Sequence, residues 1–195
     1  MKFYRVDTSR SLWGDFGRIL IWLASRRGLL DAVVFSGGEP TAQPELPAAI
    51  DAVRALGFAV GLHTGGAYPR RLAQVLPKLD WVGLDVKASA AHYATVTEVP
   101  GSGFSAFESL DLVRNAGIAY EVRTTVHPLL TPPDELVRLA HELAACGVKR
   151  WVLQPFRPTG CASELLVGAA PAGTVLDDAL LARLAAHVPI IEGRV

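Results

Sequence analysis

Side chains that could bind a charged ligand or transfer a proton recur at one kind of position in this sequence, where a predicted strand ends. Parallel strands bring their carboxyl ends to one edge of a sheet, and in α/β folds that edge is where ligands bind. We therefore expect these side chains to line a polar cavity. They are Glu39 after the first predicted strand, His63 and Thr64 after the second, Asp85 and Lys87 after the third, His127 after the fourth, and Gln154 and Arg157 after the fifth.

The first of these strand ends has the most unusual composition. An apolar β-branched run, Val33–Phe35, stops at Ser36-Gly37-Gly38-Glu39-Pro40. Adjacent glycines lack the Cβ atoms that keep a ligand away from the backbone. Glu39 adds a carboxylate, and Pro40 fixes the direction in which the chain leaves. The segment suits close approach of a ligand, and the alternative is a tight strand-to-helix turn with a solvated glutamate.

Two basic residues are predicted in places that call for an explanation. Arg123 lies inside the run Glu-Val-Arg-Thr-Thr-Val, and burying an unpaired charge costs several kcal/mol, so it needs a partner or a polar cavity. Alternation puts Arg123 on one face with Thr125 and Glu121, so a surface pair with Glu121 is the alternative. Lys87 is one of only four lysines. The spacing Asp-Val-Lys puts its charge on the face of Asp85, which favours a functional role.

The histidines and cysteines have structural explanations of comparable weight. His63 and His127 follow strands, where a hydrogen-bonded structural histidine and a ligand-binding one are about equally expected. Cys146 is predicted at a helix C-terminus and is expected to be inert, and Cys161 lies in a loop without a flanking thiol. Two cysteines form no disulfide framework, and they indicate a reducing, cytoplasmic setting.

Helices and strands are predicted to alternate along the chain. Apolar residues at helical spacing define the helices, with glycine or proline at their ends. Short β-branched runs define the strands. The predicted strands are 33–36, 58–63, 81–86, 120–126, 150–154 and a short terminal one within 190–195; the predicted helices are 12–27, 44–57, 69–76, 106–115, 131–147 and 177–187. The stretches 89–105 and 155–174 are predicted to be irregular.

Length and composition limit the possible folds and partners. Half of the 195 residues are hydrophobic, which excludes a disordered chain. Basic and acidic residues number nineteen each, so the net charge suggests neither a nucleic-acid nor a membrane partner. The first residues lack the apolar core of a signal peptide, and Ile19–Leu23 is too short to span a bilayer.

The alternation of elements predicts an α/β fold with a parallel sheet and right-handed crossovers. Five strands and a short terminal one are too few for a closed eight-stranded barrel, so a curved partial barrel fits better. Because no internal repeat and no linker divides the chain, residues 1–195 are expected to form a single domain.

The segment Gly37-Gly38-Glu39-Pro40 resembles the GGEP segment of radical S-adenosylmethionine (SAM) enzymes. Around it, Arg27–Ser36 resembles the activating branch, and especially the activating proteins of anaerobic ribonucleoside-triphosphate reductase. Further segments fit the same branch in order, so the resemblance runs from about Leu12 onward. They are Leu84-Asp85-Val86-Lys87, Tyr120–Val126 and Leu153–Pro158.

This resemblance implies a partial (β/α) barrel of the radical SAM type, which binds SAM beside a [4Fe-4S] cluster. A cationic lysine suits the SAM carboxylate, and an anionic glutamate suits its ammonium group. By position, the implied cofactor-binding residues are Gly37, Gly38, Glu39 and Pro40 at the methionine amino group, Thr64, Asp85 and Lys87 around the methionine carboxylate and ribose, and Arg123 and Gln154 on the cavity floor.

The resemblance also implies an activity and its partners. An electron from the cluster would cleave SAM to a 5′-deoxyadenosyl radical, which in the activating branch removes hydrogen from a glycine of a partner reductase. The implied partners are a glycyl-radical reductase and an electron donor such as flavodoxin or ferredoxin.

The sequence departs from the family at the cluster. The family places Cys-x-x-x-Cys-x-x-Cys after its first strand, because an iron–sulfur cluster needs thiolate ligands. This chain has no such motif, so no catalytic or metal-binding residue is assigned. The first barrel strand is also expected to be missing, which would leave the strand at 33–36 with an unpaired edge.

Three explanations of this departure remain open. We favour an incomplete domain whose cluster segment lies upstream of Met1, because every downstream motif keeps its order. The second is a degenerate homologue that binds SAM or a partner without radical chemistry. The third is a different barrel enzyme in which Lys87 forms a Schiff base. Asp85 argues against the third, since a neighbouring anion favours the charged lysine.

Overall fold

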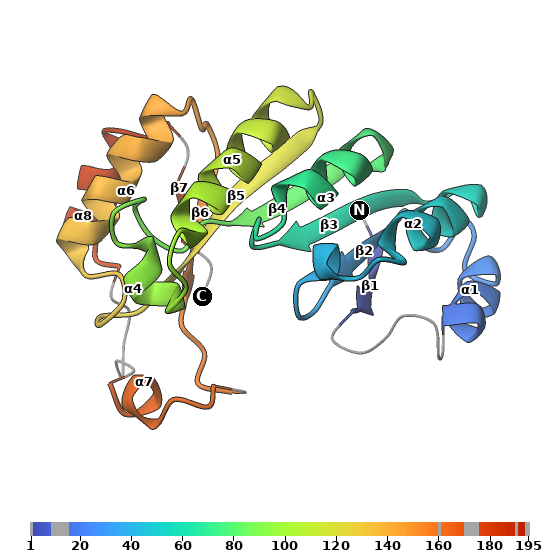
Figure 1. Cartoon of the computed structure of the whole chain (residues 1–195), viewed down its shortest axis with the longest axis horizontal. Coiled ribbons are helices and arrows are strands. Elements are labelled where there is room, and N and C mark those ends of the chain that lie inside the picture. Colours follow the sequence, from blue (N-terminus) through green and yellow to red (C-terminus); the bar gives the residue numbers. More distant parts are fainter. Residues whose placement is uncertain (1, 9–15, 160, 170–175, 190, 194–195) are drawn as a thin grey trace. The chain divides into compact units, whose positions relative to one another are not determined.

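The computed structural model describes residues 2–8, 16–159, 161–169, 176–189 and 191–193, and helices and strands alternate along it (Figure 1). The predicted parallel α/β fold is confirmed. The chain divides into two compact units. The first comprises Met1–Leu84 with Glu108–Tyr120, and the second comprises Asp85–Phe107 with Glu121–Val195.

Parallel strands form the centre of the first unit. β2 pairs with β1 on one side and β3 on the other, and β3 pairs with β4. All five residues of β2 are buried, which agrees with its apolar sequence, because a parallel strand is covered on both faces. The strands are β1 (Phe3–Asp7), β2 (Ala32–Ser36), β3 (Ala59–Thr64) and β4 (Trp81–Asp85).

The helices of the first unit bury apolar stripes. Ile50 and Val53 of α2 and Leu72 of α3 are fully buried, as the spacing of apolar residues predicts. The helical elements are α1 (Phe16–Ala24), η1 (Pro40–Ala42), α2 (Leu46–Ala55), α3 (Pro69–Val75), η2 (Leu76–Lys78) and α5 (Ser102–Asn115), whose first turns belong to the second unit.

The second unit repeats this arrangement with β6 paired in parallel to β5 and β7. Leu136, Leu139 and Leu143 of α6 are fully buried, as is Trp151 of β6. The elements are β5 (Ala119–Val126), β6 (Trp151–Pro155), β7 (Ile191–Gly193), α4 (Tyr93–Thr97), α6 (Pro133–Ala145), α7 (Glu164–Gly168) and α8 (Asp178–Ala185).

The expectation that the first strand is missing is wrong. Phe3–Asp7 forms β1, which runs in register from Phe3 opposite Ala32 to Asp7 opposite Ser36. The edge of β2 that we expected to be unpaired is therefore covered. β1 escaped the sequence analysis because Val6 is its single buried residue, which leaves almost no apolar periodicity.

Two stretches predicted to be irregular contain short helices. α4 lies within 89–105, where α5 also begins at Ser102, and α7 lies within 155–174. The side chain of Ser163 caps α7 by accepting from the backbone N–H of Leu166 at 3.3 Å. Helices of five residues leave too little periodicity to predict. Within the described residues, no helix has the length and hydropathy needed to cross a membrane.

Candidate functional site

The turn after β2 requires glycine at its first position. Gly37 and Gly38 have φ values of +85° and +55°, a region that side chains rarely adopt. A Cβ on Gly37 would overlap the side chain of Asp7 at the end of β1. Thr8 holds the same turn, because its N–H donates to the carbonyl of Ser36 at 2.6 Å and its hydroxyl donates to the carbonyl of Gly37.

The carboxylate of Glu39 ties this turn to the end of β3. Its Oε1 accepts from the N–H of Thr41 at 3.1 Å, from the hydroxyl of Thr41, and from the hydroxyl of Thr64 at 2.7 Å. Its Oε2 accepts from the N–H of Gly65 at 2.8 Å. Among the described residues Oε2 has one donor, and because a carboxylate oxygen has two lone pairs, it can accept from a further donor. Glu39 is thus a fixed anion rather than a solvated one.

Thr64 and the glycines after it form a rigid support. Thr64 is 2% exposed, and its hydroxyl accepts from the N–H of Gly66 at 3.0 Å while donating to Glu39. Gly66 has a φ of +70°, and a Cβ there would lie 2.8 Å from Cβ of Ser109. The hydroxyl of Ser109 donates to the carbonyl of Gly66 at 2.8 Å. The one hydroxyl proton of Thr64 is therefore committed to Glu39.

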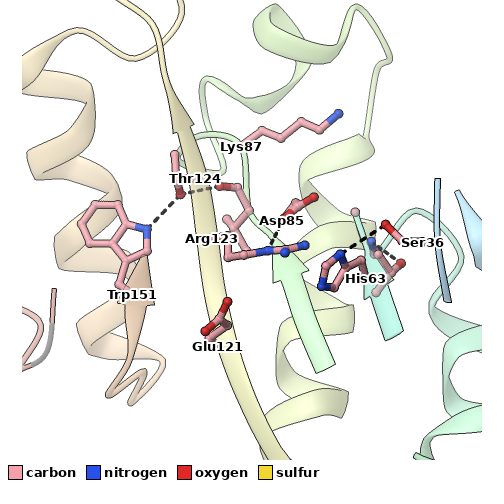
Figure 2. Close-up of polar contacts among 12 residues, drawn as sticks. Ser36, His63, Asp85, Lys87, Glu121, Arg123, Thr124 and Trp151 are labelled. Carbon is pink, nitrogen blue, oxygen red and sulfur yellow. Dashed lines mark hydrogen bonds and ion pairs between the residues drawn. The ribbon is translucent and has the colours of Figure 1, made fainter. Parts of the chain in front are cut away.

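His63 is linked to Ser36 on the neighbouring strand (Figure 2). The Ser36 hydroxyl lies 3.2 Å from Nδ1 of His63, and the imidazole packs edge-on against Trp81 with ring centroids 5.3 Å apart. The sequence placed both residues at strand ends but gave no signal that they pair.

In the second unit, Arg123 has the partner that its burial demands. Its Nε donates to Oδ1 of Asp85 at 2.8 Å, with the arginine side chain 8% exposed and the aspartate 45% exposed (Figure 2). Glu121, the alternative partner, is 4% exposed and accepts from Nε of Arg150 at 3.3 Å, so it does not lie on the surface. Asp85 therefore compensates a buried charge and still presents part of its carboxylate to solvent.

Lys87 lies just past the end of β4, with its backbone held and its side chain exposed. The Lys87 N–H donates to the hydroxyl of Tyr93 at 3.3 Å. Its side chain extends away from the Asp85–Arg123 pair in Figure 2. Within the described part of the chain the Lys87 ammonium makes no ion pair. This exposure gives Lys87 none of the desolvation that activates a Schiff-base lysine.

Three other predicted strand-end residues differ in their surroundings. Gln154 of β6 lies opposite Thr125 of β5 and is half-buried, whereas Arg157 is exposed. His127 is fully buried. Its Nδ1 accepts from the N–H of Leu129 at 3.2 Å, so Nε2 carries the proton, 3.0 Å from the carbonyl of Leu166. His127 is thus a structural histidine.

Several contributors to these contacts were missed from the sequence. Asp7 and Thr8 pack on the glycine turn, and Thr41 and Gly65 supply donors to Glu39. The local pattern Glu-Pro-Thr was the signal for Thr41, because a side chain two residues after a strand-end carboxylate can reach back to it. Asp7 carried no comparable signal.

Comparison with known proteins decides the family. Residues 13–143 match the family model described as the radical SAM superfamily, which is more than half of the 195 residues. The chain belongs to the radical SAM superfamily.

One relative of this radical SAM chain is named as a candidate glycyl-radical enzyme activating enzyme of Methanocaldococcus jannaschii. It is 27% identical over 143 residues, a segment that covers 69% of this chain and 58% of the relative. The match thus spans little more than half the length of that protein.

Solved structures share the fold of this radical SAM chain. A domain of pyruvate-formate lyase-activating enzyme from Bacteroides vulgatus has a TM-score of 0.63 at 17% identity, covering 84% of this chain and 99% of that domain. SuiB of Streptococcus suis bound to S-adenosylmethionine has a TM-score of 0.66 at 14% identity, covering 93% of this chain and 43% of SuiB. These similarities confirm the predicted partial (β/α) barrel.

The superfamily implies SAM and an iron–sulfur cluster, and the residues of this chain fit the two groups differently. SAM carries an ammonium and a carboxylate, and the chain offers a glycine turn without Cβ atoms, a fixed carboxylate at Glu39 and an exposed ammonium at Lys87. These features fit SAM.

The cluster does not fit the residues present. The sequence contains two cysteines. Cys146 caps α6, and Cys161 lies between β6 and α7. Across the described residues, no three His, Cys, Asp or Glu side chains gather as metal ligands. No step of a reaction through a cluster can therefore be assigned to residues of this chain.

Proposed function

We propose that this chain is a SAM-binding domain of the glycyl-radical-enzyme-activating type. One observation carries the proposal: the carboxylate of Glu39, fixed by donors from Thr41, Thr64 and Gly65, beside a glycine turn that a Cβ would fill. A carboxylate held in place before the ligand arrives loses no side-chain entropy on binding, so it is suited to recognise an ammonium group.

Each proposed contact follows from a group that the chain leaves available. Oε2 of Glu39 would accept from the SAM ammonium group, and the turn of Gly37 and Gly38 would allow the methionine backbone to approach. Lys87 would pair with the SAM carboxylate. The exposed part of the Asp85 carboxylate suits ribose hydroxyls, which are hydrogen-bond donors.

Four further predicted residues keep supporting roles in this proposal. Thr64 acts through Glu39, because its hydroxyl proton is committed there. Arg123 holds Asp85 in place, and Gln154 remains a proposed lining residue on β6. Pro40 fixes the chain direction after the turn as the first residue of η1.

Bound SAM would supply a 5′-deoxyadenosyl radical after one-electron cleavage. The residues of this chain would bind and orient SAM, and they do not include the cysteine motif that holds a cluster. SAM binding is common to the activating enzyme and to a non-catalytic SAM-binding homologue.

We further propose a glycyl-radical enzyme as the partner, with flavodoxin or ferredoxin as electron donor. The relative from M. jannaschii, which is named for activation of such an enzyme, supports the class. The resemblance of Arg27–Ser36 supports anaerobic ribonucleotide reductase as the member. Co-purification with that reductase, compared with an unrelated glycyl-radical enzyme, tests this choice.

Isothermal titration calorimetry with SAM and 5′-methylthioadenosine tests the SAM site. Glu39→Gln removes the charge that the ammonium group requires and should weaken SAM binding at least about tenfold, since a hydrogen bond between charged groups contributes about 1.5–3 kcal/mol. Methylthioadenosine lacks the amino acid, so its affinity should change little.

Glu108→Gln is the matched control, because Glu108 is an exposed glutamate on α5 of the same unit. It should bind both ligands like the wild type. Equal SAM affinity of the wild type and Glu39→Gln would refute the role of Glu39, and a wild type that binds no SAM would refute the function.

A further inference from the structure

The backbone after β4 is held by two carboxylates of α6, Glu135 and Glu142. The N–H of Ser89 donates to Oε1 of Glu135 at 2.7 Å, and the N–H of Ala90 donates to Oε2 of Glu142 at 2.8 Å. Residues seven apart lie on one face of a helix. Two glutamates, two turns apart, thus bind consecutive amides of one loop, and we call this pair the carboxylate clamp.

Glu135, the buried member of the clamp, carries a desolvation cost that packing alone would not require. Glu135 is 1% exposed, and a buried carboxylate is tolerated only when it is well hydrogen-bonded. Its second oxygen accepts from Nε of Arg138 at 3.0 Å. An apolar residue here would avoid this cost, because a buried ion pair is often no more stabilising than an apolar replacement of the same volume.

The clamped segment is buried at Ser89, whereas Ala90 is exposed but closely packed against α5. Ser89 is 1% exposed, and its hydroxyl has no hydrogen-bond partner within the described residues. A Cβ on Gly103, in the first turn of α5, would lie 3.0 Å from the carbonyl oxygen of Ala90. The loop therefore has little room to shift while both carboxylates hold it.

The backbone between β4 and the clamp is fixed as well. The buried hydroxyl of Tyr93 donates to the carbonyl of Asp85 at 3.4 Å and accepts from the N–H of Lys87. The hydroxyl of Thr124 donates to the carbonyl of Val86 at 2.6 Å. Every residue from 85 to 90 except Ala88 thus has a backbone group held by one of these contacts, while the side chain of Lys87 is exposed.

We propose that Glu135 and Glu142 are positioning residues, which fix the loop so that the Lys87 ammonium is placed for a ligand carboxylate. This rests on the proposed binding of SAM. A lysine has a long flexible side chain, so holding its backbone lowers the entropy that binding must remove. The clamp sets affinity for the carboxylate of the ligand and leaves the rest of the ligand unaffected.

Glu142 offers the sharper test because it is only half-buried, so its substitution is compatible with folding. Glu142→Ala removes the acceptor for Ala90, whereas Glu142→Gln keeps an oxygen that can accept the same N–H. Asp134→Asn is the control on the same helix, where the aspartate is 84% exposed. Each variant is titrated with SAM and with decarboxylated SAM, and hydrogen exchange is followed at residues 86–90 without ligand.

Glu142→Ala is expected to bind SAM about tenfold more weakly than the wild type and decarboxylated SAM equally well, with faster exchange at 89 and 90. Glu142→Gln should restore most of the SAM affinity, and Asp134→Asn should match the wild type. Glu135→Ala should repeat the ligand selectivity if it folds.

Two outcomes would overturn the positioning role while leaving the proposed function intact. They are an unchanged SAM affinity in Glu142→Ala, and an equal loss for both ligands, which would indicate a purely structural role. If the wild type binds neither SAM nor decarboxylated SAM, both proposals are overturned. The wild type is titrated first, so this outcome is separated from the effects of the variants.

Discussion

Glu39 holds its surroundings through hydrogen bonds that form without any ligand. A carboxylate with donors from both sides of a turn cannot rotate freely, and it makes the geometry of Gly37 and Gly38 dependent on Thr64 and Gly65. The turn is thus specified by the hydroxyl of Thr64 and the N–H of Gly65 as well as by its own glycines. Substitutions at Gly37 test how strictly this geometry is enforced.

Gly37→Ala should destabilise the chain by about 1–3 kcal/mol. A non-glycine residue at φ +85° is strained, and its Cβ would displace Asp7. Gly17→Ala is the control, because a Cβ there meets nothing within 4 Å and alanine favours the helix by up to about 1 kcal/mol. Urea unfolding of both variants measures the difference, and equal stability would show that the turn relaxes at no cost.

At the scale of elements, β1 matters more than its sequence suggests. It covers the edge of β2 and delivers Asp7 and Thr8 to the glycine turn. An element with one buried side chain is therefore both a structural edge and a support for the site.

Val6→Ala should lower the free energy of unfolding by about 1–3 kcal/mol, because it removes buried methyl groups and leaves a cavity. Phe3→Ala in the same strand should cost less than about 1 kcal/mol, since Phe3 is 54% exposed. Chemical denaturation monitored by circular dichroism compares them. A larger loss for Phe3→Ala would mean that β1 is not paired as described.

The elements and the site were predictable to different degrees. Five strands and the main helices could be located from apolar residues, such as the run 33–36 and the leucines of α6. Buried faces repeat with the period of the strand or helix, so they leave a pattern in the sequence. Too few residues are buried in β1, α4 and α7 to give a recognisable apolar periodicity. Arg123 could be predicted to need a partner, but its pairing with Asp85 joins residues 38 positions apart in the chain, which no local pattern encodes.

At the scale of the whole molecule, we predict that residues 1–195 unfold as one domain. The boundaries between the two compact units fall inside β4, α5 and β5, between Leu84 and Asp85, between Phe107 and Glu108, and between Tyr120 and Glu121. A division within continuous strands is unlike a flexible linker, where domain boundaries usually fall.

Native-state hydrogen exchange checks this prediction. Amides of β2 in the first unit and of β6 in the second should report the same opening free energy, equal to that of global unfolding. Two distinct values that respond separately to Val6→Ala would instead establish independent domains.

The hydrogen bonds around Thr124 have a spectroscopic consequence. The indole N–H of Trp151 donates to the Thr124 hydroxyl at 2.9 Å (Figure 2). That hydroxyl donates to the carbonyl of Val86 at 2.6 Å. Hydrogen bonds in series polarise one another, and Val86 stands between Asp85 and Lys87. Buried Trp151 is therefore linked to this strand end by two hydrogen bonds. We expect a ligand that binds there to change the emission of Trp151, so that binding can be followed without any attached label.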